Sequence, residues 1–188
     1  MRLEAKDLSF RYHKGNRQKN PIILSGPNGF GKTTFCKILA GYEKPDEGLV
    51  LLDGKPLSEY KGYCPVQLIW QHPQEAVNPR RKMKTVLEEG GVLDERLIHG
   101  LGIEKEWMER YPGELSGGEL QRFCIARALG EKTSFLLADE ITAMLDLITQ
   151  SQIWNFLLEE VRSREIGLLV VSHSEPLLQR ICTGRIQL

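Results

Sequence analysis

The order of hydrophobic and polar residues along this chain predicts short strands separated by helices. Apolar or β-branched runs at residues 22–25, 66–70, 134–138 and 167–172 have the length of strands. The last two runs are apolar without a break, which is typical of strands covered on both faces of a parallel sheet. Segments 35–40, 120–129 and 148–164 have the pattern of helices. Because strands and helices alternate, we expect an α/β fold with a parallel sheet built by right-handed crossovers.

The other segments predict smaller parts of the same fold. Residues 3–12 are typical of one extended segment, followed by a polar loop at 13–21, and residues 49–52 form a strand that ends at the hairpin-type turn Asp53-Gly54. From about residue 84 to 110 the apolar positions follow a helical pattern, broken by Gly90, Gly91 and Gly100. We expect a small helical lobe, at about residues 80–125, inserted into one domain that spans residues 1–188.

Composition narrows the possible functions. Basic and acidic side chains number 25 each, so no net charge draws the chain to nucleic acid or to an anionic membrane. No apolar run approaches the roughly 18 residues of a membrane-spanning helix, and the first residues lack a signal-peptide pattern. We therefore expect a cytosolic protein that meets a membrane only through a partner. The cysteines lack metal-ligand spacing, which predicts ordinary reduced thiols.

A glycine-rich segment directly after the strand at 22–25 is the strongest candidate for chemistry. Residues 26–34 read GPNGFGKTT and match G-x-x-x-x-G-K-[ST] at every fixed position. Backbone N–H groups of such a loop surround a β-phosphate, and the N-terminus of the next helix faces the same anion. A chance glycine-rich turn is the alternative, which the flanking strand and helix weaken. The residues expected around the nucleotide are Asn28, Gly29, Gly31, Lys32, which would neutralise phosphate charge, Thr33, which would hold Mg²⁺, and Thr34.

Two adjacent carboxylates, Asp139 and Glu140, end the apolar strand at 134–138. Asp139 is placed to hold Mg²⁺, and Glu140 to polarise an attacking water. Acidic residues commonly close a strand, so a solvated strand end is the alternative for the pair taken alone. The pair gains weight from the other motifs in the chain.

A second candidate anion site opens a predicted helix. Residues 115–122 read LSGGELQR, with Ser116, Gly117 and Gly118 just before the helical run. An ordinary capped helix would explain the serine but not the whole run. Since one nucleotide has little use for two phosphate cradles in one chain, we expect two subunits to meet head to tail with ATP between them.

Taken together, these motifs resemble those of the nucleotide-binding subunit of an ATP-binding-cassette (ABC) protein. Residues 26–34 match its Walker A loop, 115–121 its signature, 135–140 its Walker B strand and 143–146 its dimer-contacting D-loop. Gln71 matches the glutamine that senses Mg²⁺ and couples to the transmembrane partner, and His173 matches the switch histidine that contacts the γ-phosphate. The resemblance implies Glu140, His173 and Gln71 as catalytic residues, with Thr33, Gln71 and Asp139 as metal ligands.

The resemblance also implies a fold and a function. The fold is that of a P-loop NTPase, with a parallel-sheet core, an inserted helical lobe and a small antiparallel β-lobe. Residues 71–80, 111–114 and 138–153 are similar to the dipeptide, oligopeptide and nickel importer branch. The function implied is hydrolysis of ATP, with Mg²⁺, by a homo- or heterodimer that powers solute import through separate membrane permease subunits. Such a subunit is cytoplasmic and peripheral to the cell membrane, with no direct insertion into it.

Two other functions remain open on the sequence alone. One is a soluble accessory ABC ATPase of an enzyme complex, for example in phosphonate degradation. The other is a regulatory module that binds nucleotide without turnover. For the import subunit we expect no nucleic-acid partner, because the charges of the chain balance.

The chain departs from the family pattern at a few positions. Tyr12 stands where the family has an aromatic that stacks on adenine, although a core role is the alternative. Only a short loop separates Tyr12 from the strand that enters Gly26, so we expect the antiparallel lobe to be shortened. Phe30 replaces a small residue, and Ile141 replaces the proline usual after the catalytic glutamate. Neither change removes a group that hydrolysis requires.

Overall fold

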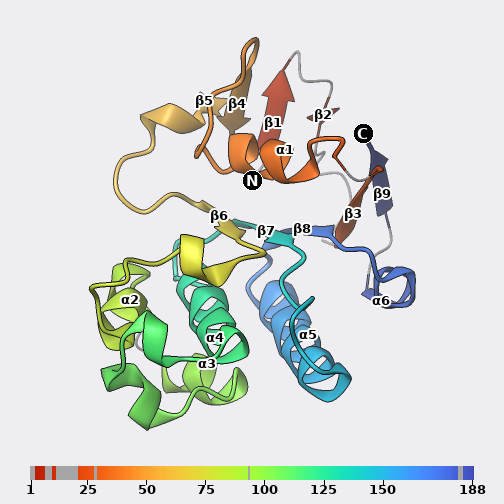
Figure 1. The fold of residues 1–188 in the computed structure, drawn as a ribbon. Helices are drawn as coiled ribbons and strands as arrows, with labels where there is room; N and C mark the ends of the chain where they lie inside the picture. The colour runs from red at the N-terminus through yellow and green to blue at the C-terminus, as the bar shows by residue number, and fades with distance from the viewer. Residues whose placement is uncertain (1–2, 7–9, 12–20, 28, 93, 182–183) are drawn as a thin grey trace. The chain divides into compact units, whose positions relative to one another are not determined.

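The computed structural model describes residues 3–6, 10–11, 21–27, 29–92, 94–181 and 184–188 (Figure 1). The chain divides into two compact units. The first contains Met1–Leu68, Lys132–Asp139 and Glu165–Leu188, and the second contains Ile69–Glu131 and Glu140–Arg164. One of the crossings between the units therefore falls on the peptide bond that joins the two candidate carboxylates.

A five-stranded sheet in the order β6-β7-β8-β3-β9 forms the core of the first unit. Strands β7, β8, β3 and β9 run parallel, with Ala138 opposite Val170 and Leu24 opposite Ile186. Every residue of β7 and β8 is buried, as the apolar runs predict, and this includes the charged Asp139 at the end of β7. The strand bounds are Ile22–Ser25 (β3), Val66–Ile69 (β6), Phe135–Asp139 (β7), Gly167–Val171 (β8) and Gly184–Gln187 (β9).

Two helices belong to the first unit. Helix α1, Lys32–Leu39, follows β3 and buries Phe35 and Cys36. Burial raises the pKa of the Cys36 thiol far above its ordinary value, so this cysteine is a neutral core residue, as predicted. Helix α6, Glu175–Ile181, was not predicted. With seven residues it spans only about two turns, too few for a clear helical period to show in the sequence.

The first unit also contains a four-stranded antiparallel sheet in the order β2-β1-β4-β5, which confirms the small antiparallel lobe. The prediction of one extended segment over residues 3–12 is wrong, because β1 and β2 pair antiparallel with Glu4 opposite Arg11. No glycine or proline at residues 7–9 signals that reversal. The tight turn between β4 and β5 was predicted, and Asp53 and Gly54 both have positive φ there. The bounds are Leu3–Lys6 (β1), Phe10–Arg11 (β2), Leu49–Leu52 (β4) and Lys55–Pro56 (β5), followed by the 3₁₀ turn η1, Leu57–Glu59.

Helices and 3₁₀ turns make up the second unit. The predicted glycine breaks are confirmed, since Gly90 caps α2 and Gly100 ends α3. Both glycines are also needed for packing: a Cβ at Gly90 would lie 2.6 Å from the Arg127 carbonyl oxygen, and one at Gly100 would lie 2.1 Å from the Phe156 ring. The elements are η2 (Pro73–Glu75), α2 (Met83–Glu89), α3 (Glu95–Gly100), η3 (Lys105–Glu109), η4 (Pro112–Glu114), α4 (Gly117–Ala128) and α5 (Leu147–Ser163).

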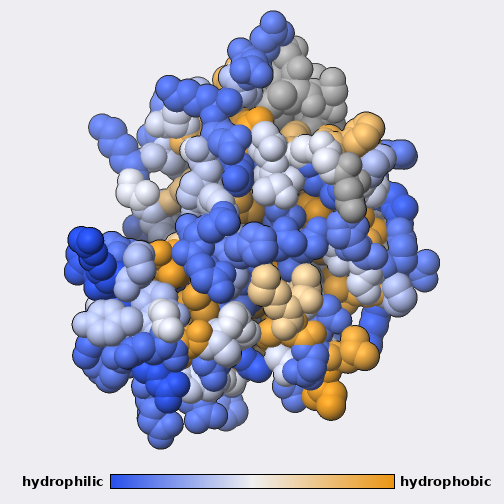
Figure 2. All heavy atoms as spheres, viewed as in Figure 1, coloured by the Kyte–Doolittle hydropathy of each residue, from blue (hydrophilic) through white to orange (hydrophobic). Residues whose placement is uncertain are grey.

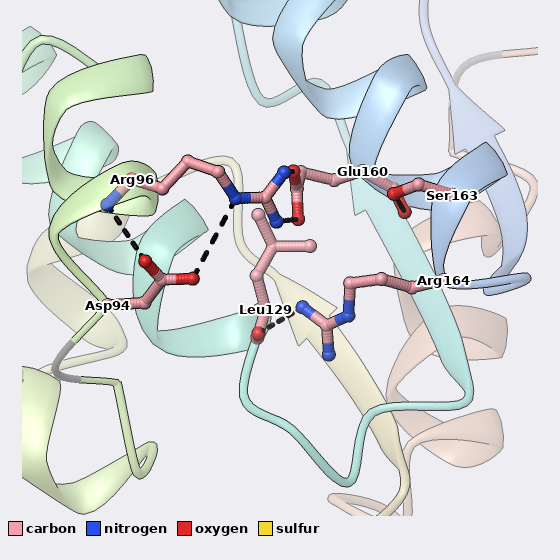
Figure 3. Close-up of polar contacts among 6 residues, drawn as sticks. All are labelled: Asp94, Arg96, Leu129, Glu160, Ser163 and Arg164. Atoms are coloured by element: carbon pink, nitrogen blue, oxygen red, sulfur yellow. Dashed lines mark hydrogen bonds and ion pairs between the residues drawn. The ribbon is translucent and has the colours of Figure 1, made fainter.

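Apolar packing and an ion pair to a buried glutamate hold these helices together. Met83 and Val86 of α2 and Phe123 of α4 are fully buried, and each such side chain contributes about 1.5–3 kcal/mol relative to exposure. Arg96 of α3 reaches the carboxylate of Glu160 on α5 through both terminal nitrogens, at 2.7 and 3.0 Å (Figure 3). Glu160 is fully buried and Arg96 is about half exposed, so removing Arg96 would leave a buried charge without this counter-ion and lower the stability of the helices.

Among the residues that the structure describes, no helix combines the length and the apolar character needed to cross a bilayer.

We expect Gly167→Ala to destabilise the first unit. A Cβ at Gly167 would lie 2.4 Å from the ring of Phe135 on the paired strand, and this ring is buried and cannot move aside easily. Overpacking of this kind costs about 1–3 kcal/mol. Urea denaturation should show a lower midpoint for this variant. Gly113→Ala is the matched control, because a Cβ there meets nothing within 4 Å; equal midpoints for the two variants would contradict the prediction.

Candidate functional site

The glycine-rich segment at residues 26–34, which we call the phosphate loop, runs from β3 into the first turn of α1, as the sequence predicts. Gly29 and Gly31 have φ of 81° and 83°, a left-handed conformation that costs other residues about 1–2 kcal/mol. Helix α1 then begins at Lys32, with Gly31 as its N-cap and no side-chain hydrogen bond to the cap. The first N–H groups of α1 therefore lack a capping side chain and remain available to an anion.

Lys32 is held across this loop. Its Nζ donates to the carbonyl oxygens of Gly26 and Pro27, at 2.8 and 3.0 Å, and the residue is buried. These two bonds fix the ammonium beside the loop without neutralising it, because backbone carbonyls carry no formal charge. The geometry thus provides a positive charge and free N–H groups in one loop, which suits a phosphate.

Asp139 lies at the carboxyl end of β7, in contact with the start of α1. Its side chain is only 2% exposed, and burial raises the pKa of the carboxyl group. A hydrogen bond from Thr33 and the nearby charge of Lys32 act in the opposite direction and lower that pKa. The carboxylate therefore presents its oxygens in a poorly solvated place, next to the Thr33 hydroxyl.

This pair of oxygens fits Mg²⁺. Magnesium prefers oxygen ligands, keeps several waters, and is bound by one or two protein groups together with substrate phosphates. Thr33 and Asp139 supply such a pair next to the phosphate loop. Among the described residues there is no cluster of three or more histidine, cysteine or acidic side chains, so the donor set does not suit a fully protein-ligated metal.

His173 follows β8 and lies near the same carboxylate. The imidazole is exposed, and its charge is among the influences that lower the pKa of Asp139. The first unit thus places Lys32, Thr33, Asp139 and His173 at the carboxyl ends of β3, β7 and β8, the edge at which parallel sheets bind nucleotides.

Glu140 and Gln71 meet in the second unit. The Gln71 Nε2 donates to the Glu140 Oε2 at 3.2 Å. Glu140 has a φ of 49°, an unusual value for a residue with a side chain, at a cost of order 1–3 kcal/mol. The turn that follows is held by the Thr142 hydroxyl, which accepts hydrogen bonds from Gln150 at 2.7 Å and Trp154 at 3.0 Å on α5. These contacts maintain the strained turn.

A capping box between Ser116 and Glu119 closes the start of α4. Ser116 Oγ accepts from the Glu119 N–H at 3.3 Å, and the Glu119 carboxylate accepts from the Ser116 N–H at 2.8 Å. This box leaves the Gly117 and Gly118 N–H groups without an intrahelical acceptor. A Cβ at Gly118 would lie 2.8 Å from Leu145, so the segment 143–146 packs directly on this helix start.

The predicted site residues therefore fall into two groups. Lys32, Thr33, Asp139 and His173 belong to the first unit, with Thr34 exposed on α1, while Gln71, Glu140 and Ser116 to Gly118 belong to the second. Tyr12 and Asn28 lie outside the described residues, and the adenine-stacking role and the shortened lobe stay predictions.

Sequence reasoning missed one set of residues on α4. Gln121, Cys124 and Arg127 contact the backbone next to Gln71. Their spacing of three residues, which places them along one side of the helix, was the signal available in the sequence.

Comparison with known proteins identifies the family of the chain. The family model described as ABC transporter matches residues 5–143, so the chain belongs to the ABC transporter family. The nickel import ATP-binding protein NikE of Rhodospirillum rubrum is 34% identical over 86% of this chain and 65% of its own length. The oligopeptide transport ATP-binding protein OppF of Streptococcus mutans is 28% identical over 95% of this chain and 69% of its own length. These relatives match the importer branch that the sequence resembles.

Solved structures agree on the fold. A putative ABC transporter ATP-binding protein from Pyrococcus furiosus gives a TM-score of 0.75 at 23% identity, over 100% of this chain and 98% of its own. The ATP-binding cassette MJ0796, a dimer in a post-hydrolysis state with ADP and Pi, gives 0.74 at 23% identity over 92% of this chain and 82% of its own. The predicted P-loop NTPase fold is confirmed.

We expect Asp139→Asn to stabilise the protein near neutral pH. Because the folded state raises the pKa of Asp139, it holds a proton more tightly than the unfolded state does, and stability falls as pH rises from about 3.8 through that raised pKa. The amide of the variant does not ionise, so its stability does not fall in this way. Its urea midpoint should therefore exceed that of the parent at pH 7 and approach it near pH 3. The affinity of the variant for ATP in the presence of Mg²⁺ should fall by about 10–100-fold, measured by calorimetry.

Asp146→Asn is the control of opposite sign. Hydrogen bonds from the Thr149 side chain and from the first N–H groups of α5 lower the pKa of Asp146, so its contribution is present at neutral pH and lost as pH falls. Identical pH profiles for the two variants would contradict the assignment for Asp139.

Proposed function

We propose that this chain is an ATP-hydrolysing subunit of an ABC import system. The observation that supports this most directly is the contact between Thr33 and the buried Asp139, next to a lysine held across a glycine-rich loop. A phosphate-binding loop alone serves many proteins, but a hydroxyl and a carboxylate paired beside it provide for Mg²⁺·ATP.

Each site residue has a distinct role in this proposal. Lys32 and the N–H groups of the loop bind the β- and γ-phosphates. Thr33, Asp139 and Gln71 would hold Mg²⁺, which, when bound, neutralises charge that develops on the phosphates. Glu140 accepts a proton from the attacking water, with Gln71 orienting its carboxylate at 3.2 Å, and His173 contacts the γ-phosphate.

We further propose that two such subunits share the nucleotides. The free N–H groups of Gly117 and Gly118, together with the Ser116 hydroxyl, form a second anion site in the chain. In a head-to-tail dimer this helix start would face the phosphate loop of the other copy. Dimeric cassettes with this fold, such as MJ0796, are consistent with that arrangement.

An exposed apolar patch supports the dimer independently. Met144, Leu147 and Ile148 are 56%, 81% and 73% exposed, although each is large and apolar. Figure 2 shows this hydrophobic surface over the end of α5 at which the helix begins. The patch continues from residues 143–146, which pack on the Ser116 helix start, so a second copy that docks there would cover it.

The import role follows from the relatives. NikE and OppF are named as import or transport ATP-binding proteins, and this chain spans 65% and 69% of their lengths. We propose that the chain works at the cytoplasmic face of the membrane by binding permease subunits. The solute would then be selected by those other polypeptides.

Glu140→Gln tests the chemistry. The amide retains the size of the side chain but cannot accept the proton of the attacking water, so steady-state ATP hydrolysis should fall by at least about 10²-fold. ATP-dependent dimerisation, measured by light scattering after gel filtration, should persist. A variant with the full hydrolysis rate would exclude Glu140 as the base.

The apolar patch provides a control in the same background. Leu147→Glu, added to Glu140→Gln, places a charge on the proposed contact and should weaken the ATP-dependent dimer by at least about tenfold. Glu131→Lys, an exposed charge change elsewhere, should leave the dimer intact.

Copurification tests the import role. We expect the tagged chain, expressed at native levels, to retain an integral membrane protein after detergent extraction, identified by mass spectrometry. Recovery of only a soluble enzyme complex would contradict import while leaving the ATPase proposal intact.

A further inference from the structure

Three side chains along α4 contact the backbone of residues 70–76. Gln121 Nε2 donates to the Trp70 carbonyl at 3.2 Å, Cys124 Sγ to the Pro73 carbonyl at 3.8 Å, and Arg127 Nη1 to the Ala76 carbonyl at 2.7 Å. Each donor lies 51 residues after its acceptor, so helix and segment advance in step, three residues at a time. We call this set of three hydrogen bonds the α4 clamp.

The clamp adds side-chain hydrogen bonds to a segment with little regular structure of its own. Residues 70–76 follow the end of β6 and form only the short turn η2, in which the Pro73 carbonyl also accepts from the Ala76 N–H at 3.1 Å. Gln121 and Cys124 are buried, and burial raises the pKa of the Cys124 thiol to about 11, which keeps it a protonated donor. The Gln121 Oε1 is also buried and has no partner among the described residues. Retaining a glutamine here has a cost in stability, and the bond to Trp70 provides a reason for it.

The clamp connects two parts of the proposed site. Gln121 lies little more than one turn from the Ser116 helix start, and the carbonyl it holds belongs to the residue directly before Gln71. Gln71 in turn donates to Glu140. Because a helix of 12 residues moves as a rigid body, a shift of its N-terminus would be passed to residues 70–76.

We infer that Gln121, Cys124 and Arg127 are positioning residues that fix the segment 70–76 on α4 and thereby set where Gln71 meets Glu140. None of the three touches the nucleotide in this inference, which rests on the proposed ATPase function. They act through Gln71, so their effect should appear in turnover rather than in ATP binding.

Arg127→Met tests the clamp. It removes the charged donor to Ala76 and retains most of the apolar stem. We expect faster hydrogen exchange in the peptide that covers residues 71–77, and a kcat about tenfold lower with the KM for ATP within about twofold. Arg127→Lys retains a cation and should recover part of both losses.

Arg122→Met is the matched control, because Arg122 on the same helix donates to a carbonyl elsewhere, that of Leu101. It should affect stability but neither the exchange at 71–77 nor kcat. Equal effects of the two substitutions would overturn the inference. If Arg127→Met does not fold, Cys124→Ala removes a single weak donor and permits the same comparison, with smaller changes.

A double mutant separates positioning from general stability. If Arg127 acts through Gln71, then Arg127→Met should lower kcat no further in a Gln71→Ala background. Independent, multiplying effects would overturn the inference. If the parent chain hydrolyses no ATP, the proposed function fails, and the exchange comparison between Arg127→Met and Arg122→Met still decides whether the clamp exists.

Discussion

The burial of one carboxylate is the constraint on which the proposed site depends. Asp139 ends a strand in which every residue is buried, and burial raises the pKa of its carboxyl group, an effect that Thr33 and Lys32 offset only in part. Both of these residues come from the first turn of α1, so the phosphate loop and the end of β7 hold each other in register. A desolvated acid is costly, and beside a loop that presents backbone N–H groups it creates a place for a cation and a polyphosphate.

Strain is concentrated at the next residue. Glu140 adopts a positive φ directly after the sheet, where the chain passes from the first unit to the second. The carboxylate on the sheet side belongs to the proposed metal site, and the other faces Gln71. One peptide bond thus joins the proposed metal ligand to the proposed base. The rigid turn held by Thr142 explains how an unfavourable backbone conformation persists there.

Much of the fold could be predicted because its signals are local. The strand at residues 22–25, the turn at Asp53 and Gly54 and the glycine breaks of the helical lobe follow from side-chain period and backbone freedom. The reversal between β1 and β2 was missed because no glycine or proline marks it, and α6 because seven residues show too little period. The motif residues could be named because each motif is a short run of neighbouring residues. The side chains that they contact could not be named, because those lie far away in the sequence.

The sequence by itself determined the α/β class, the phosphate loop and the order of motifs, since each depends on residues close together in the chain. Only the tertiary structure decided which distant groups meet. The bond from Thr33 to Asp139 spans more than a hundred residues, and the α4 clamp joins groups 51 residues apart. Such contacts depend on how strands and helices pack, and packing brings together atoms whose separation in the sequence carries no local signal.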